Sequence, residues 1–337
     1  MTTAPDADRP TLPGWRKLAL RASLGLVGGV AVAVLAGWAL GVHPREVLRS
    51  LEGVPAWSVL FCVLSSYGVL GFQALRWHRV MGPRLGLSYV DALQAQVVGF
   101  FFNAFLPARG GDLLRVQYLG RRTGKSRATI LGTELVDRWL DWWGWIPTFI
   151  VMALLSDPPR WLFKALGIFG ALLVAWGLAM VVLTRSGRLG REDTRFGRAM
   201  TALRSGVQSF REPRIWVTAL VIAPLPWVWE ATAITIAGRA FGLHLSLVQS
   251  FSVMIAFNLA MIVPTPGGVG SQESGGTAAL AFFGFDHSRS LAFLFVYHFT
   301  QLLPGMATGA ALLLAQGEVL FGRGPSDTVT PPPAPEP

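Results

Sequence analysis

The chain has 337 residues, of which 52% are hydrophobic and only 14% are charged. Soluble domains carry about 25% charged residues, so this composition excludes an ordinary soluble domain and favours an all-α polytopic membrane protein. A formal net charge of +10 does not indicate nucleic acid, because the basic residues lie in short segments between apolar runs. The positive-inside rule assigns such segments to the cytoplasm, so a multi-pass protein of the cell (inner or plasma) membrane is expected.

Six apolar runs are long enough to cross the ~30 Å hydrocarbon layer as helices. In chain order these are residues 19–42, 55–75, 128–155, 161–184, 215–242 and 289–316. They form one transmembrane domain, residues 17–320, in which a basic loop, 185–214, joins the halves 17–184 and 215–320. Residues 1–16 are expected to be a cytoplasmic N-terminal segment. The Pro-rich residues 321–337 are expected to be disordered.

Two further apolar runs, 86–106 and 247–263, each lead into a Pro-x-x-Gly-Gly segment, at residues 107–111 and 264–268. Irregular backbone at membrane depth is tolerated only where protein buries it or water reaches it. Paired breaks of this kind in two halves of a membrane protein point to a binding site between the halves. The two segments are therefore the first candidates for a functional site.

Loop charge indicates how these two runs meet the membrane. If 86–106 crossed the bilayer, Arg121, Arg122 and Lys125 would lie outside the cell, against the positive-inside rule. We therefore expect two re-entrant hairpins that enter from opposite faces, as an inverted repeat would produce. The same rule assigns to the cytoplasm both chain termini and a loop holding three arginines, Arg76, Arg79 and Arg84.

Ionisable residues inside spans cost about 2.5–3.5 kcal/mol each on insertion scales, so they usually face a partner or a cavity. The run 128–155 holds four: Glu134, Asp137, Arg138 and Asp141. Three of them are spaced three or four residues apart and share a helix face. They form either a self-satisfied ion-pair cluster or a surface turned toward substrate.

Glu230 lies in the middle of another span, just after Pro224 and Pro226, with no basic residue within one helical turn. It therefore needs a tertiary partner, a proton or a substrate cation. His298 and Gln301, one turn apart in the last span, are typical of hydrogen bonds between membrane helices.

Consecutive glycines beside a helix terminus can present free backbone N–H groups to an anion. Gly110 and Gly111, with Arg109 and Arg115 nearby, could hold a phosphate in this way, and Asp112 would orient one of the arginines. The alternative is that glycine and proline only make the tight turn of a hairpin.

Several motifs of soluble enzymes are missing from the sequence. It contains no P-loop, no dinucleotide fingerprint and no G-x-S-x-G nucleophile elbow. The five histidines are scattered without metal-ligand spacing, and the single cysteine, Cys62, lies in an apolar run. We therefore expect no catalytic residues, no metal and no cofactor.

The chain resembles the family built on the transmembrane domain of lysylphosphatidylglycerol synthases, which also occurs as stand-alone flippase-like membrane proteins. The resemblance covers about residues 17–320 and is carried by three ordered motifs. These are Asn103 with Pro107–Asp112 and Arg115, then Glu134 with Asp137 and Arg138, and then Pro264–Gly270 with Glu273. The resemblance does not extend to the synthase domain of the two-domain relatives, so we expect no aminoacyl-tRNA chemistry from this chain.

The resemblance and the interrupted spans together predict a lipid translocase. It would move a polar-headgroup lipid, such as an aminoacyl-phospholipid or a polyprenyl-linked glycan, between leaflets. The candidate substrate-binding residues are Asn103, Arg109, Gly110, Gly111, Asp112, Arg115, Glu134, Asp137, Arg138, Glu230, Asn258, Gly267, Gly268 and Glu273.

The expected partners are membrane lipids with anionic phosphate headgroups, and a synthase or glycosyltransferase is a further candidate partner. Two alternatives stay open. One is a membrane glycosyltransferase, or its accessory subunit, acting on a lipid carrier. The other is a proton-coupled solute transporter that uses Glu230.

Overall fold

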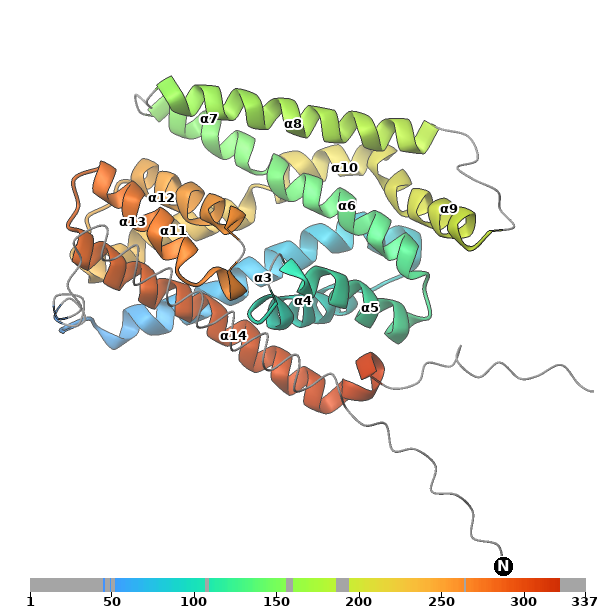
Figure 1. Ribbon diagram of the computed structural model, residues 1–337, viewed down its shortest axis with the longest axis horizontal. Helices are drawn as coiled ribbons and strands as arrows, with labels where there is room; N and C mark the ends of the chain where they lie inside the picture. Colours follow the sequence, from blue (N-terminus) through green and yellow to red (C-terminus); the bar gives the residue numbers. More distant parts are fainter. Residues whose placement is uncertain are drawn as a thin grey trace, which may run out of the picture.

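The computed structural model describes residues 45, 49, 52–106, 109–155, 160–185, 194–263 and 265–321. Every regular element in this part of the chain is a helix (Figure 1). The expected span 19–42, the N-terminal segment 1–16 and the tail after residue 321 lie outside the described residues, as do Pro107, Ala108 and Pro264.

Four helical stretches are long and apolar enough to cross a membrane: Ala56–Leu85, Leu166–Arg185, Pro213–Ala240 and His287–Gln316. They correspond to four of the six expected spans and make the chain a multi-pass membrane protein. The first is helix α3 (Ala56–Leu85), the second lies in α8 (Arg160–Arg185), and the last lies in α14 (His287–Phe321). The third joins α10 (Pro213–Val217), a π-helical turn (Thr218–Ile222) and α11 (Leu225–Ala240).

The prediction of a loop after residue 75 is wrong. Helix α3 continues to Leu85 and ends at Gly86, whose φ of 65° is the left-handed conformation that glycine adopts readily. Arg76 therefore lies inside the helix, and its side chain is fully buried. The apolar run appeared to end there because an arginine rarely lies inside a span, but carboxylates on a neighbouring helix compensate its charge.

The expected span 128–155 is divided at Gly144 into α6 (Arg127–Trp143) and α7 (Trp145–Leu155). The expected basic loop 185–214 contains a helix, α9 (Arg195–Val207). Thr194 caps the N-terminus of this helix, and the helix packs on α6. Gly132 and Gly206 let the two backbones touch, because a Cβ on Gly206 would lie 2.1 Å from the Thr129 carbonyl oxygen.

Both interrupted runs fold as helical hairpins. The first pairs α4 (Tyr89–Asn103) with α5 (Gly111–Thr123), and the second pairs α12 (Leu247–Leu259) with α13 (Ser271–Phe282). Each hairpin begins with a capping box, in which a serine side chain and the residue three positions later bond to each other's backbone N–H. At 1.5 Å per residue these helices are about 18–23 Å long, shorter than the ~30 Å hydrocarbon layer.

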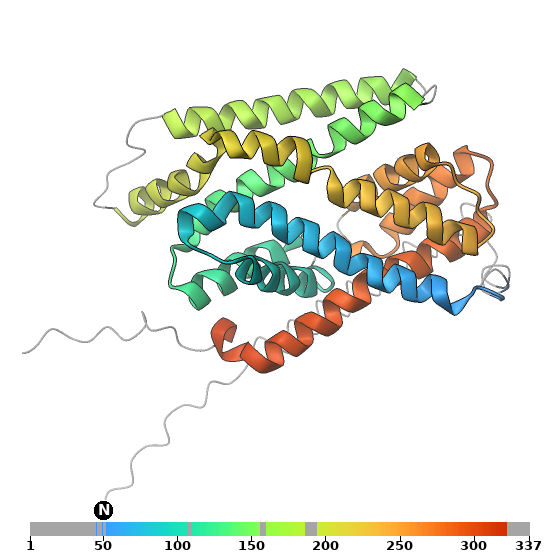
Figure 2. The same ribbon diagram turned by 180° about the vertical axis from the view of Figure 1, so that it is seen from behind.

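The two hairpins approach each other from opposite ends of the molecule, and their tips meet near its centre (Figure 1). A Cβ on Gly267 in the second tip would lie 3.2 Å from the carbonyl oxygen of Ala104 in the first. The long helices α3 and α14 cross beside the tips and pack on each other (Figure 2). The order of helix, helical hairpin and helix thus occurs twice, as α3–α6 and as α11–α14.

Candidate functional site

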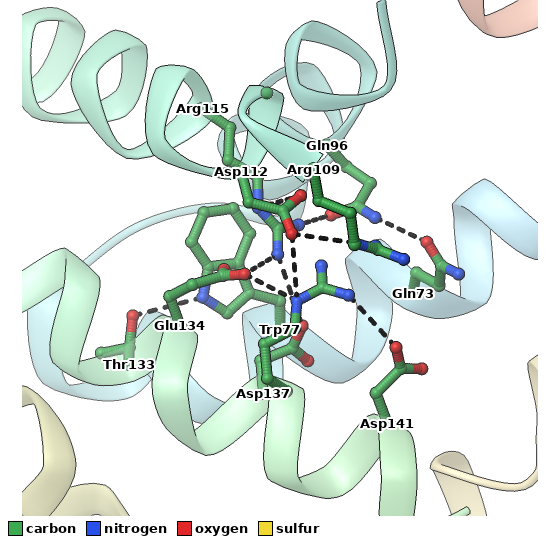
Figure 3. A network of polar contacts seen from close by, with 12 residues as sticks. Gln73, Trp77, Gln96, Arg109, Asp112, Arg115, Thr133, Glu134, Asp137 and Asp141 are labelled. Carbon is green, nitrogen blue, oxygen red and sulfur yellow. Dashed lines mark hydrogen bonds and ion pairs between the residues drawn. The ribbon is translucent and has the colours of Figure 1, made fainter. Parts of the chain in front are cut away.

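The charged stripe on α6 forms ion pairs along one helix face, as its spacing predicts. Arg138 Nε lies 2.8 Å from Glu134 Oε1, and Arg138 Nη1 lies 3.2 Å from Asp141 Oδ2. Asp137, the fourth member, turns toward α3 instead (Figure 3). The stripe is thus a connected cluster and not four separate groups.

Arg76 of α3 joins this cluster from the other side. Its Nε donates to Asp137 Oδ1 at 2.8 Å, and its Nη1 donates to Asp141 Oδ1 at 2.6 Å. The guanidinium is fully buried, so its charge depends entirely on these two carboxylates. This residue holds α3 against α6 beside the centre of the molecule.

Arg115 of α5 is also part of the scaffold. Its side chain is 1% exposed, its two terminal nitrogens donate to Gln96 and Glu134, and its guanidinium lies 4.5 Å from the centre of the Trp77 ring (Figure 3). The prediction that Arg115 holds a phosphate is corrected by this geometry, because both terminal nitrogens are committed to Gln96 and Glu134 and the buried side chain does not line the cavity. Glu134, whose carboxylate accepts from Arg115, is buried with it.

At the tip of the first hairpin, Asn103 connects the two helices. Its Oδ1 accepts from the Gly111 N–H at 2.8 Å, and its Nδ2 donates to Asp112 Oδ1 at 3.1 Å. Asp112 Oδ2 accepts in turn from Arg109 Nε at 3.1 Å, so Asp112 orients an arginine as expected. The Gly111 N–H, predicted to face an anion, is occupied by Asn103, which corrects that part of the hypothesis.

Arg109 is the arginine of this tip that remains accessible. Its side chain is 42% exposed, and its backbone has a φ of 56°, which is uncommon for a residue other than glycine. Gly110, the residue before α5, has helical backbone angles. The strained position of Arg109 turns its guanidinium toward the middle of the molecule, between the two hairpins.

The second tip uses its carboxylate differently. Glu273 is fully buried; its Oε2 accepts from the Gly270 N–H at 2.7 Å, and its Oε1 lies 2.8 Å from His298 Nδ1. Glu273 therefore caps α13 and does not line a path for substrate, contrary to the expectation. His298 lies between Glu273 and the cavity and lines the cavity in its place. Gly267 and Gly268 both have positive φ and make the turn.

A cavity of about 130 Å³ lies between the two tips. It receives residues from both hairpins, from α3 and α6, and from α11 and α14. Its polar side chains are Gln73, Asn103, Arg109, Asp141, Glu230, Asn258, Gln272, His298 and Gln301. Phe100, Trp227, Phe257 and Met261 contribute apolar surface. Of the candidate substrate-binding residues, the cavity thus gathers Asn103, Arg109, Glu230, Asn258 and Gly267, and of the other polar residues singled out in the spans it gathers Asp141, His298 and Gln301.

The charges around the cavity are unequally distributed. The four arginines Arg76, Arg109, Arg115 and Arg138 contact four carboxylates, those of Asp112, Glu134, Asp137 and Asp141. Glu230 is outside this balance, because its only hydrogen bond in the described structure comes from Asn258 Nδ2 at 3.4 Å. The described residues contain no group of three or more His, Cys, Asp or Glu side chains that could hold a metal ion.

Sequence reasoning missed the glutamines Gln73, Gln96 and Gln272 and gave Arg76 to a loop. Gln96 Nε2 donates to Gln73 Oε1 at 2.6 Å, which links α4 to α3 beside the ion pairs. A signal was available, because Gln73 and Arg76 are three residues apart in an apolar run and so share a helix face.

Comparison with known proteins places the chain in a family of membrane domains. A family model described as the lysylphosphatidylglycerol synthase TM region matches residues 25–309. A UPF0104 membrane protein from Methanothermobacter thermautotrophicus is 26% identical over 275 residues, which cover 72% of this chain and 81% of the relative. The matched region contains both hairpins and every residue of the cavity.

Proposed function

This chain belongs to the family of the lysylphosphatidylglycerol synthase transmembrane region, and on that premise we propose that it is a lipid translocase. The observation that carries the proposal is the polar cavity between the hairpin tips, beside a buried ion-pair cluster and among helices long and apolar enough to cross a membrane. A headgroup would pass through this cavity while the acyl chains stay in the bilayer. The substrate would be a lipid with an anionic phosphate headgroup, such as an aminoacyl-phospholipid or a polyprenyl-linked glycan.

Arg109 would make the first contact with the headgroup phosphate. It lines the cavity, it is the most exposed arginine of the cluster, and its one carboxylate partner is shared with Arg138. A phosphate can replace a carboxylate as an acceptor of charge-assisted hydrogen bonds. Arg138, whose Nη2 is buried without a hydrogen-bond partner in the described structure, would support the same anion.

The hairpins would be re-entrant, entering from opposite faces and exposing the cavity to each side in turn. Their short helices support this topology. The basic C-terminal ends of helices α3 and α5 also support it, because both lie on one side of the molecule. There Arg84 contacts Glu212 and Arg122 contacts Gln316. We assign this side of the protein to the cytoplasmic face of a cell membrane and place both chain termini on the same face.

The test is a leaflet-sidedness assay in proteoliposomes that contain acyl-chain-labelled phosphatidylglycerol or polyprenyl phosphate. A membrane-impermeant reductant added outside destroys the label in the outer leaflet, so continued loss of signal reports translocation. Wild-type protein should accelerate this loss over protein-free vesicles. If it accelerates neither phosphate lipid, the proposal is refuted.

Arg109→Ala should slow translocation about tenfold or more, because a hydrogen bond to a charged group contributes about 1.5–3 kcal/mol. Arg239→Ala is the matched control, since Arg239 is exposed at the end of α11 and does not line the cavity. Equal rates for Arg109→Ala and wild type would show that the headgroup does not use Arg109.

A further inference from the structure

Glu230 is the carboxylate of the cavity that no arginine neutralises. It lies on α11, which begins after Pro224, and it lines the same cavity as Arg109. Its one hydrogen-bond partner in the described structure is Asn258, whose Nδ2 also donates to the Met254 carbonyl at 2.9 Å. The arginines of the cluster are already engaged by four other carboxylates.

The one arginine or lysine that shares the cavity with Glu230 in the described structure is Arg109, which is paired with Asp112, and the groups that face Glu230 from the helices packed against α11 supply no further positive charge. From α3 comes Gln73, and from α12 comes Asn258; Cys62 of α3 lies near Tyr297. From α14 come Tyr297, His298 and Gln301; His298 is bonded to Glu273, so any positive charge on it is matched there. Asp141 of α6 is negative and bonded to Arg76 and Arg138. The π-helical turn and α7 contain no ionisable residue.

An ionised carboxylate in this position is costly. Removing a charge from water without a partner is so unfavourable that the group takes up a proton instead, and carboxylates inside membrane helices follow this rule. A metal ion would need several oxygen or nitrogen ligands, and the described residues contain no group of three or more His, Cys, Asp or Glu side chains that could supply them. The cavity gives protons access to the carboxyl group, because Glu230 is half-buried and not sealed.

We propose that Glu230 is a proton-binding site, and that its protonation is linked to the binding of an anionic headgroup at Arg109, so that lipid and proton move together. This proposal rests on the translocase function. With Glu230 ionised, a phosphate bound at Arg109 shares the cavity with an unpaired negative charge that repels it. With Glu230 protonated, the phosphate is paired with Arg109 alone. Because such coupling is reciprocal, lipid affinity should rise as pH falls, by at most tenfold per pH unit for one proton.

The proton site is tested directly by infrared difference spectroscopy of the purified wild-type protein, without any transport. A protonated carboxyl group has a carbonyl stretch that a carboxylate lacks. We expect such a band at neutral pH in wild type, its loss in Glu230→Gln, and its persistence in the control Glu52→Gln, whose side chain is exposed. A spectrum of Glu230→Gln that equals wild type at neutral and mildly acidic pH would overturn the proposal.

The coupling is tested in the proteoliposome assay with an imposed pH gradient and labelled phosphatidylglycerol. Wild type should move lipid faster in the direction of proton entry, and reversal of the gradient should reverse the preference. Glu230→Gln, which imitates the protonated state, should translocate without responding to the gradient. Gradient-independent transport by wild type would refute the coupling while leaving the translocase function intact. Absence of any transport would refute the function, and the infrared result would still decide whether Glu230 binds a proton.

Discussion

Removal of Arg76 should destabilise the protein strongly, because it takes two ionic hydrogen bonds away from the buried carboxylate of Asp137. Arg76 donates to Asp137 at 2.8 and 3.4 Å and to Asp141 at 2.6 Å. In Arg76→Met, Asp141 keeps Arg138 at 3.2 Å, but Asp137 is left with Arg115 at 3.9 Å. Breaking a buried pair by removing one partner costs about 3–5 kcal/mol, and we expect Arg76→Met to lie in this range.

The assay is unfolding of purified protein in detergent, by heat and by denaturant, with Arg79→Met as the control. Arg79 lies on the same helix with an exposed side chain, so its substitution should change the unfolding free energy by about 0.5 kcal/mol or less. Adding Asp137→Asn to Arg76→Met should recover most of the loss, whereas adding Asp141→Asn should recover little. The reasoning is refuted if Arg76→Met is as stable as Arg79→Met, or if the two second substitutions rescue equally.

Two further substitutions test the packing and the surface. Gly111→Ala should destabilise by about 1–3 kcal/mol or more, because its Cβ would lie 2.1 Å from the Gly99 carbonyl oxygen; Gly170→Ala, with open space around it, should be tolerated in the same thermal unfolding measurement. Arg84→Ala should cost about 1 kcal/mol or less, and less still in high salt, because Arg84 and its partner Glu212 are 30% and 27% exposed. A large, salt-independent loss for Arg84→Ala would contradict this view of the pair.

Much of the fold could be predicted from apolar run length and loop charge. Four of the expected spans correspond to helices of sufficient length and composition, and the described residues of both Pro-x-x-Gly-Gly segments lie at the tips of helical hairpins. The end of α3 could not be predicted in this way. Run length treats an arginine as the end of a span, whereas Arg76 continues inside the helix because α6 supplies its carboxylates. Tertiary pairing of this kind leaves no mark on local hydropathy.

Prediction of the site was less complete, for a related reason. Spacing along one helix correctly grouped Glu134, Arg138 and Asp141, since residues three and four apart are neighbours on a helix. Spacing does not say which side of a helix faces a cavity. Arg115 and Glu273 were therefore expected at the substrate path, although both are buried behind it. Arg109 and Glu230, chosen by the same reasoning, do line the cavity.

The chemical asymmetry between the two halves is not confined to the two Pro-x-x-Gly-Gly segments. The sequence places Arg109 and Arg115 after the first break and Glu273 after the second, which suggests an anion site facing a cation site. In the structure, Arg115 links α5 to α4 and to α6, and Glu273 caps α13 and contacts His298 of α14, so both side chains belong to the scaffold. On the translocase proposal, the groups left for the headgroup are Arg109 and Glu230, one from each half of the bundle. Because their charges are opposite and, of the two, Arg109 alone has an ionic partner in the described structure, we propose that the protonation of Glu230 sets whether the cavity favours an anion.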